Sequence, residues 1–324
     1  MPEHENWPWG DIDEKSRISV ADNLPKITIV TCSYNQGQFL EATILSVLKQ
    51  HYPNLEYIVI DGGSTDNSVD IIKKYSSAFT HWRSEPDNGQ SHAINKGFAL
   101  ATGDILGWLN SDDMLAPGAL YAVSQAWAEM RPDVLTGNSD FVDENGNFER
   151  HWFAQEPRIE DLLTASAVTA PQPSTFWSRE CWRKYGPLDE DFHWVMDYAL
   201  WVRMAAGGVR WSILNKTLSL WRHHEDQKTK QLTRSVVYVQ DTREMLSRFI
   251  KSDLCNERLR KLARYGIEKT WIKQWRKEYD IERMRTSFAV YWLRKGIGRR
   301  QCFWVREYYG TLLRRYCPIL LKVK

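Results

Sequence analysis

The sequence predicts an α/β fold built on a doubly wound, mostly parallel sheet, and three observations carry this prediction. First, β-branched apolar runs alternate with stretches of helical periodicity between residues 26 and 120. Second, the apolar runs end in polar clusters, as strands do at the ligand-binding carboxyl edge of an open sheet. Third, the chain has 324 residues, 43% of them hydrophobic and 26% charged, which is enough to bury a large core.

The first 110 residues repeat the order strand, loop and helix. β-Branched residues dominate the predicted strands, and apolar side chains recur every three or four positions in the predicted helices. The predicted elements are a strand within 26–35, a helix over 37–50, a strand with a Gly-rich turn over 55–66, a helix over 67–75, a short strand near 80–84, a helix from about 91 to 101 and a strand over 104–109.

The pattern after residue 118 is less regular but still mixed. Apolar periodicity predicts helices and strands in this part, and nearly everything beyond residue 240 is compatible with helix. The predictions are a helix over 119–130, a strand over 133–143, a buried segment at 171–177, an amphipathic helix over 197–206 and one or two strands over 211–225.

Charge divides the chain near residue 240. Residues 241–324 hold 22 Lys and Arg against 9 Asp and Glu, whereas residues 1–240 hold 21 against 32, so the formal net charge of +2 hides two opposite parts. We therefore expect an N-terminal lead (1–25), an α/β domain (26–240, with halves at 26–120 and 121–240) and a basic, aromatic-rich helical extension (241–324).

The sequence shows neither the pattern of a signal peptide nor cysteine spacing typical of a metal site. The first residues lack a basic segment followed by an apolar one, so we expect no signal peptide, and no apolar window of about 18 residues predicts a spanning helix. The cysteines are odd in number and lack CxxC spacing, which predicts a reducing, cytoplasmic compartment and no zinc site. They are Cys32, Cys181, Cys255, Cys302 and Cys317.

Two neighbouring acids, Asp112 and Asp113, follow the apolar run LGWL at a predicted strand end. Adjacent carboxylates repel each other unless a metal ion, a basic side chain or water meets them. Their oxygens suit Mg²⁺ or Mn²⁺, which bridges diphosphate oxygens, although a solvated turn or a helix N-cap is the alternative for such a pair by itself. Polar clusters at residues 33–35, 61–66 and 87–90 favour a ligand site.

The turn DGGSTD follows the second predicted strand. Its glycines and small hydroxyl groups let backbone amides approach a ligand, and Asp61 can accept a hydrogen bond from a base or a ribose, yet such turns are common without any ligand. No GxGxxG follows the first strand, no GxxxxGK[ST] is present, and no Glu stands at the twelfth position from Asp61. These absences exclude a dinucleotide fingerprint, a Walker loop and an EF-hand.

The stretches ITIVTCSYNQGQF, IVIDGGSTD and SEPDNGQSHAINKGFALATGDILGWLNSDDM, in this order, closely resemble the family 2 glycosyltransferases. The resemblance returns in QPSTFW, in YGPLDEDFHWVMDYALWVRMAAGG and in WRHHEDQKT. It implies the GT-A (nucleotide-diphospho-sugar transferase) fold. It also implies transfer of a sugar from a nucleoside-diphosphate donor to an acceptor hydroxyl, with inversion at the anomeric carbon, and a divalent metal, Mg²⁺ or Mn²⁺.

The resemblance also implies which residues hold the donor. The family's base-binding strand ends match Cys32–Tyr34 and Asp61, and its DxD-type element matches Asn110, Ser111 and Asp112. The donor-binding candidates are Cys32, Tyr34, Asp61, Gly63, Asp87, Gln90, Asn95, Lys96, Asn110, Ser111, Asp112, His223 and His224. The metal candidates are Asp112, as the main ligand, and Asp113.

Three positions depart from the family pattern. Gly62 stands where the family commonly has a second acid, Asn110 where it commonly has Asp, and Ile94 where many relatives place an arginine. The first departure removes the usual basis for assigning the nucleotide. The last leaves Lys96 or His92 as the candidate for the missing positive charge.

The family's general base is the acid of an ED pair at the start of a helix, and only Asp197 of VMDYALWVR remains here. A carboxylate partly buried among Trp194, Tyr198 and Trp201 would have its pKa raised towards neutral, and could then take the proton of the acceptor hydroxyl. The alternative is a helix N-terminal acid that the helix dipole favours.

The paired histidines and several tryptophans allow two readings each. One of His223 and His224 could contact the donor, or both could be ordinary packed or solvated side chains. Four tryptophans could stack on sugar rings, although core positions are favoured for them: Trp152, Trp177, Trp194 and Trp201.

The basic tail interleaves Arg and Lys with aromatic and aliphatic residues beyond about residue 283. This pattern is typical of an interfacial amphipathic helix, and it also occurs in nucleic-acid binders and in packed helical appendages. Because lipid-linked acceptors would place such an enzyme at a membrane, we expect an anionic membrane surface on the cytoplasmic side as the partner, and no nucleic acid.

The sequence as a whole predicts a glycosyltransferase that uses a saccharide or lipid-linked acceptor, in bacterial surface polysaccharide or glycolipid assembly. A nucleotidyltransferase on a similar sheet is an alternative, although CSYNQGQF lacks the Lys and Arg of its usual basic loop. A non-catalytic sugar- or membrane-binding module is the second alternative.

Overall fold

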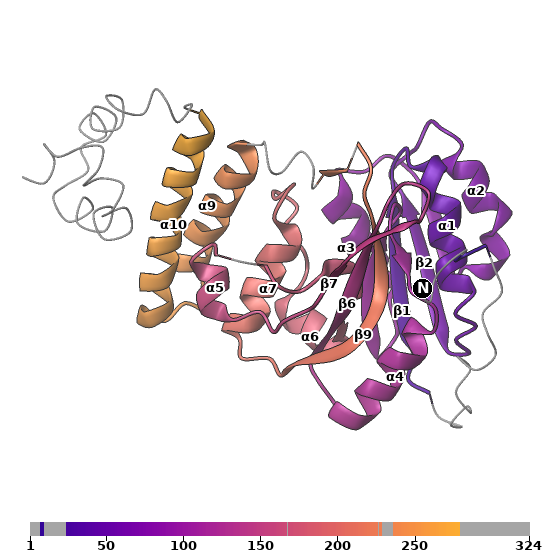
Figure 1. Ribbon diagram of the computed structural model, residues 1–324, viewed down its shortest axis with the longest axis horizontal. Helices are drawn as coiled ribbons and strands as arrows, with labels where there is room; N and C mark the ends of the chain where they lie inside the picture. Colours follow the sequence, from indigo (N-terminus) through magenta and orange to yellow (C-terminus); the bar gives the residue numbers. More distant parts are fainter. Residues whose placement is uncertain (1–6, 10–23, 167, 226, 229–235, 279–324) are drawn as a thin grey trace, which may run out of the picture. The chain divides into compact units, whose positions relative to one another are not determined.

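A computed structural model describes residues 7–9, 24–166, 168–225, 227–228 and 236–278 (Figure 1). Its centre is a nine-stranded mixed sheet in the order β3-β2-β1-β4-β8-β6-β9-β5, with β7 paired to β6. The strands are β1 (Ile27–Ser33), β2 (Leu55–Asp61), β3 (His81–Ser84), β4 (Ile105–Asn110), β5 (Met114–Leu115), β6 (Val134–Val142), β7 (Phe148–Trp152), β8 (Thr175–Ser178) and β9 (Trp211–Arg222). The predicted α/β class is confirmed.

Helices cover both faces of the sheet, each over its own apolar core. Residues of α1, α2 and α4 form one core with the sheet, and residues of α3, α6 and α7 form the other. Figure 1 shows α1 and α2 on one side of the sheet and α6 and α7 on the other. The helices are α1 (Gly37–Leu48), α2 (Ser68–Lys74), α3 (Gln90–Leu100), α4 (Ala119–Met130), α5 (Ile159–Leu163), α6 (Arg179–Tyr185), α7 (Met196–Ala206), α9 (Val236–Ile250) and α10 (Glu257–Glu278).

Four parallel strands bring the predicted polar clusters to one edge. β1 pairs in parallel with β2 and β4, and β2 pairs in parallel with β3. The register places Ser33 beside Asp61, Asp61 beside Ser84, and Cys32 beside Asn110. Since parallel strands end at the same edge, this register creates one polar rim.

The second half of the sheet is antiparallel where it joins the first. β8 lies between β4 and β6 and is antiparallel to both, while β6 and β9 run parallel to each other. Residues 171–177, expected to be buried, form the short 3₁₀ helix η3 (Gln172–Ser174) and most of β8. β9 is one strand of 12 residues, so the histidine pair follows directly after its end.

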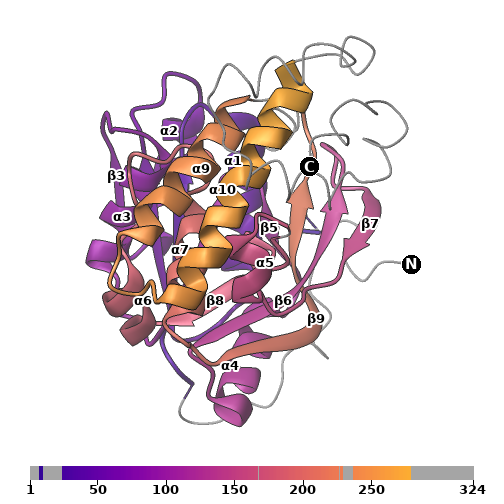
Figure 2. The ribbon, with the colours of Figure 1, turned by 90° about the vertical axis from the view of Figure 1, so that its left-hand side faces the viewer.

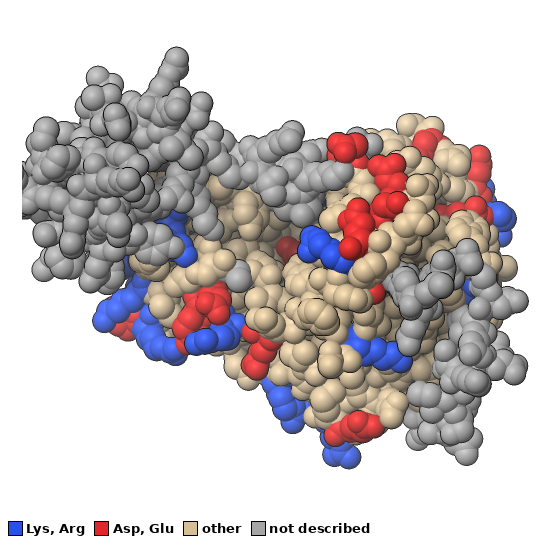
Figure 3. Space-filling view, in the orientation of Figure 1, with Lys and Arg blue, Asp and Glu red and all other residues tan. Residues whose placement is uncertain are grey.

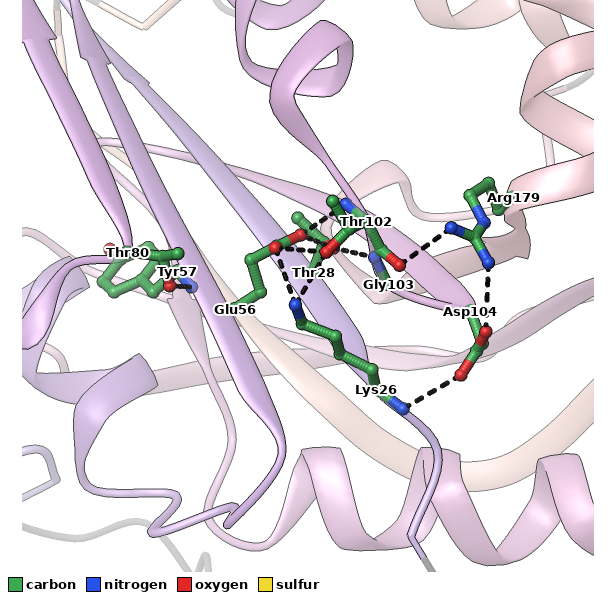
Figure 4. Close-up of polar contacts among 9 residues, drawn as sticks. All are labelled: Lys26, Thr28, Glu56, Tyr57, Thr80, Thr102, Gly103, Asp104 and Arg179. Carbon is green, nitrogen blue, oxygen red and sulfur yellow. Dashed lines mark hydrogen bonds and ion pairs between the residues drawn. The ribbon is translucent and has the colours of Figure 1, made fainter.

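A buried carboxylate holds the opposite, amino-terminal edge of the sheet together (Figure 4). Glu56 of β2 accepts hydrogen bonds from Thr28 Oγ1 and Thr102 Oγ1, both at 2.6 Å, and pairs with Lys26 Nζ at 2.9 Å. Burial alone would raise the pKa of Glu56, but these hydrogen bonds outweigh it and lower the pKa to about 2. This network braces the fold far from the polar rim.

The chain forms two compact units, residues 1–270 and residues 271–324. In the first, Met245, Leu246 and Phe249 of α9 belong to the same core as α7, and α9 lies beside α10 (Figure 2). The boundary expected near residue 240 therefore reflects charge and does not end the core. The basic tail beyond residue 283 lies outside the described residues. Of the helices within the described ranges, none is long and apolar enough to cross a membrane.

The described residues include three of the five cysteines and part of each charged segment. Cys32, Cys181 and Cys255 are buried free thiols, and Cys302 and Cys317 lie outside the described ranges. Figure 3 shows acidic side chains gathered in the upper right of the visible face, while most basic side chains lie along its lower and left parts.

Candidate active site

A chain of amide groups crosses the polar rim at the end of β4. Gln90 Nε2 donates to Asn110 Oδ1 at 2.8 Å, and Asn110 Nδ2 donates to Gln172 Oε1 at 3.1 Å. Gln172 Nε2 in turn donates to the carbonyl of Trp108 at 2.9 Å. An aspartate at position 110 would have no donor for Gln172, so this network accounts for the neutral residue where related sequences commonly have an acid.

The two neighbouring acids have different surroundings. Asp112 Oδ2 lies 3.0 Å from His224 Nε2 and remains partly exposed. Asp113 is buried and accepts hydrogen bonds from the backbone N–H of Arg222 at 3.1 Å and from Asn110 Nδ2 at 3.5 Å. Burial, followed by the charge of Asp112, raises the pKa of Asp113 well above its usual value. We expected both acids to serve as metal ligands, but these contacts make Asp113 a brace between β4 and β9.

The two histidines point to different partners. His224 is 2% exposed, and its ring lies 4.5 Å from that of Phe39. His223 instead pairs with Glu149 at 2.5 Å and contacts the ring of Phe141. Successive residues after a strand leave on opposite sides, which explains why only His224 reaches Asp112.

Arg222, the last residue of β9, is a buried cation next to this pair. Its guanidinium lies 4.8 Å from the centre of the Phe39 ring, and burial lowers its pKa despite the nearby charges of Asp113 and Asp112. Its Nε has no hydrogen-bond partner among the described residues. No local sequence signal distinguishes Arg222, although it stands within WRHHEDQKT.

Asp61 ends β2 with its carboxylate fully buried. It accepts hydrogen bonds from the backbone N–H groups of Gly63 at 3.1 Å and Ser64 at 2.9 Å, and from Ser84 Oγ at 2.7 Å. Gly63 has φ 82°, in the left-handed region that favours glycine. Asp61 therefore shapes the turn DGGSTD, and its contact with a nucleoside stays a prediction.

Tyr34 is the most open aromatic residue at the rim. It follows the end of β1 and is 63% exposed. Next to it, Asn35 has φ 51° and accepts a hydrogen bond from Thr65 N–H at 2.9 Å, so the loops after β1 and β2 hold each other. An exposed ring on a braced loop can stack on a base, and the resemblance implies a base-binding role for this strand end.

Other predicted donor ligands on and before α3 have bracing partners. Asp87 accepts from the backbone N–H of Gly89 at 2.7 Å. Asn95 exchanges hydrogen bonds with both backbone groups of Leu188, and Lys96 pairs with Glu85 at 2.8 Å. We expected Asn95 and Lys96 to bind the donor, and this stays a prediction. In the structure both residues, five and six positions after Gln90, tie α3 to neighbouring loops.

A half-buried cation that carries no sequence signal of its own, Lys228, lies next to Gln90 at the rim. Lys228 Nζ donates to Gln90 Oε1 at 2.7 Å and to the carbonyl of His193 at 3.3 Å. Its charge acts on Asp197 and Asp112, and burial lowers its own pKa. The ring of His92, the other alternative to Lys96, accepts from Asn88 N–H through Nδ1 at 3.0 Å. The only signal for Lys228 is its place shortly after the histidine pair.

Asp197 lies in the first turn of α7 and is half-buried. Its Oδ1 accepts a hydrogen bond from the backbone N–H of Tyr198 at 2.7 Å. Burial raises the pKa of Asp197, and the charge of Lys228 partly offsets this. Trp201, one turn along α7, is fully buried and stacks with Trp108, with ring centres 6.4 Å apart. The desolvated environment expected for Asp197 is therefore present.

Trp177 contacts Trp108 and is fully buried, as Trp201 is. The core position favoured for these two tryptophans is confirmed. Trp194 is half-buried. Trp152 stacks with Phe141 and Trp221 on the β6, β7 and β9 strands, with ring centres 5.7 and 5.0 Å apart.

Cys32, at the end of β1, lies at the polar rim beside Asn110. Its thiol lies 3.8 Å from Asn110 Oδ1, and burial raises its pKa to about 12. Ser111 contributes its carbonyl, which accepts from Thr43 Oγ1 at 2.8 Å and holds the turn that carries Asp112. Both residues shape the rim with neutral groups.

A divalent metal fits this site only with help from the donor. Within the described residues no three His, Cys, Asp or Glu side chains converge on one point. Asp112 Oδ2 and His224 Nε2 do converge, and a carboxylate oxygen with an imidazole nitrogen is a ligand pair that suits Mn²⁺. Diphosphate oxygens would have to complete the coordination shell.

Comparison with known proteins identifies a family and several relatives of this chain. Residues 28–180 match the family model described as glycosyl transferase family 2. An uncharacterised glycosyltransferase of Mycobacterium tuberculosis is 29% identical over 195 residues, 56% of this chain and 69% of that protein. Another from Haemophilus influenzae is 37% identical over 133 residues, 39% of this chain and 51% of that protein.

Solved structures share the fold at low identity. S. aureus TarS 1–349 in complex with UDP-GlcNAc has a TM-score of 0.61 and 18% identity, covering 76% of this chain and 73% of that one. Mannosyltransferase PcManGT from Pyrobaculum calidifontis, in complex with GDP-Man and Mn²⁺, has a TM-score of 0.56 and 15% identity, covering 94% and 86%. The fold is thus of the GT-A type, residues 28–180 carry a domain that matches glycosyl transferase family 2, and the chain is a glycosyltransferase.

Proposed function

We propose that this glycosyltransferase moves a sugar from a nucleoside-diphosphate donor to an acceptor hydroxyl, with inversion at the anomeric carbon. The observation that carries the proposal is the position of Lys228. It donates to Gln90, whose amide donates to Asn110 at the end of β4, two residues before Asp112, and it also donates to the carbonyl of His193, four residues before Asp197. The candidate donor acid and the candidate base, 85 residues apart in the chain, therefore border the same small region at the rim.

Asp197 is the general base of this proposal. An acceptor oxygen that attacks the anomeric carbon must lose its proton, and a carboxylate with a raised pKa is a better proton acceptor than an exposed one. With inversion, a single displacement forms the new glycosidic bond while the bond to the diphosphate breaks. One base is then sufficient.

Asp112 and His224 would hold a divalent metal, Mg²⁺ or Mn²⁺, together with the donor diphosphate. The metal supplies charge neutralisation for the departing diphosphate when bound. The chain's own residues orient this pair: Thr43 holds the turn of Asp112, and Phe39 packs on the ring of His224. Tyr34 and the loop held by Asp61 would contact the nucleoside.

Acceptor and location follow from the sequence analysis. We propose a saccharide or lipid-linked acceptor in bacterial surface polysaccharide or glycolipid assembly. We also propose attachment of the basic tail to an anionic membrane surface on the cytoplasmic side. The non-catalytic alternative would be favoured by an Asp197 that points away from the rim.

The proposal is tested by donor hydrolysis and transfer. Purified protein with Mn²⁺ is incubated with a panel of UDP-, GDP- and dTDP-sugars, and release of nucleoside diphosphate is measured together with a thermal-shift assay. A donor that binds the native state raises the midpoint of unfolding. Release of a nucleoside monophosphate and a sugar phosphate instead would contradict glycosyl transfer.

A further inference from the structure

Lys228 differs from other lysines of this chain in its partners. Lys74 and Lys96 each pair directly with a glutamate, at 2.5 and 2.8 Å. Lys228 is half-buried and donates instead to two neutral oxygens, Gln90 Oε1 and the His193 carbonyl. No carboxylate of a described residue lies within 4.0 Å of its nitrogen. Its positive charge is therefore held in place without being neutralised.

The amide chain explains how this charge is held. Gln90 can accept from Lys228 because its own amide N–H donates to Asn110, and Asn110 is fixed by Gln172. Each amide group in this series has one orientation that satisfies both neighbours. The ammonium has three donors, two of them with partners among the described residues, so one remains for a ligand.

The position of Lys228 indicates the chemistry of that ligand. Its partner Gln90 donates to Asn110, two residues before the candidate metal ligand Asp112, and its partner His193 lies four residues before the candidate base Asp197. The bond that breaks in the proposed reaction must lie between these two groups. A half-buried cation at that position can bind an anion and stabilise the negative charge that develops on it during the reaction.

We propose that Lys228 binds the diphosphate of the nucleotide-sugar donor and stabilises the charge that develops on it during transfer. This inference rests on the proposed function. The bond between the anomeric carbon and the β-phosphate oxygen breaks, and its electron pair stays on that oxygen, next to the ammonium. The acceptor oxygen forms the new bond to the anomeric carbon, and its proton goes to Asp197.

The test compares nucleoside diphosphates with nucleosides. Calorimetry with Mn²⁺ measures the affinity of the wild type and of Lys228→Met for UDP, GDP and dTDP and for uridine, guanosine and thymidine. Losing one charge-assisted hydrogen bond should weaken the preferred diphosphate by about 10- to 100-fold and leave its nucleoside unchanged. Lys228→Arg should keep most of the diphosphate affinity.

A matched control is Lys184→Met on α6, where the removed lysine is exposed and lies over the Tyr185 ring, and no loss is expected. Unchanged diphosphate affinity in Lys228→Met, or an equal loss for diphosphate and nucleoside, would overturn the inference. If Lys228→Met does not fold, Lys228→Gln gives the same comparison with a polar side chain. A wild type that binds none of the three diphosphates would instead refute the proposed function itself.

Discussion

Asp112 and His224 are 112 residues apart in the chain, yet Asp112 Oδ2 and His224 Nε2 lie 3.0 Å apart. Asp112 follows the central strand β4, whereas His224 follows β9, which pairs with β5 just after the acid turn. The pairing of β5 with β9 is therefore what brings the imidazole to the carboxylate. This pair is where the structure and the proposed function meet most directly.

Asp112→Asn should abolish Mn²⁺-dependent donor binding and leave the thermal midpoint almost unchanged, because Asp112 is partly exposed and an amide is a weak metal ligand. Asp113→Asn should have the opposite effects, because Asp113 is buried between β4 and β9. Donor binding should still depend on Mn²⁺, and the thermal midpoint should fall. Donor affinity with and without Mn²⁺ is the measurement. An Asp112 variant with wild-type metal dependence would remove it from the site.

Asp197→Asn separates catalysis from helix capping. Asparagine caps a helix about as well as aspartate, so a capping role predicts nearly full activity. A base role predicts a fall in single-turnover transfer of roughly 10²–10⁴-fold with donor affinity intact, because asparagine cannot take the acceptor proton. Donor binding and the thermal midpoint of the same variant are the controls. Transfer at the wild-type rate would contradict the base assignment.

The pH dependence of transfer follows from the raised pKa of Asp197. A base must be ionised to act, so the rate should rise with pH through this pKa, which lies above that of an ordinary aspartate. Lys228 partly offsets the effect of burial, so Lys228→Met should move the rise to still higher pH. The pH profile of single-turnover transfer is the measurement, and an unshifted profile in Lys228→Met would rule out this coupling.

Asp61→Ala should weaken both the free nucleoside diphosphate and the nucleotide-sugar, by roughly 1–3 kcal/mol, because the turn loses its buried acceptor. The same loss should lower the thermal midpoint. Asp70→Ala on α2 removes an exposed acid and is the matched control. A loss confined to the nucleotide-sugar in calorimetry would move Asp61 to the sugar subsite.

Glu56→Gln should destabilise the fold without touching the site. The folded-state pKa of about 2 lies below the usual value for glutamate, so the carboxylate contributes stability above pH 4.5 and loses it as pH falls towards 2. The wild type and the variant should differ by about 3 kcal/mol in free energy of unfolding at pH 7 and converge near pH 2. Urea unfolding over this pH range is the measurement, with exposed Glu129→Gln as the control. A difference independent of pH would point to packing instead.

The sequence by itself determined the alternating strands and helices, the parallel rim and the family, because local periodicity and strand-end motifs carry these features. It also indicated Asp112 and Asp197, since each stands in a recognisable local motif. The sequence could not tell apart the roles of adjacent residues of the same type, such as Asp112 and Asp113, or His223 and His224.

Only the tertiary structure decided which of these neighbours face each other, because strand pairing over more than 100 residues sets that geometry. The same holds for Asn95 and Lys96, whose partners come from the 188 loop and from Glu85. Lys228 is the clearest case. One lysine in a polar segment carries no local signal, and its role follows from burial and from the amide chain that the folded sheet assembles beside it.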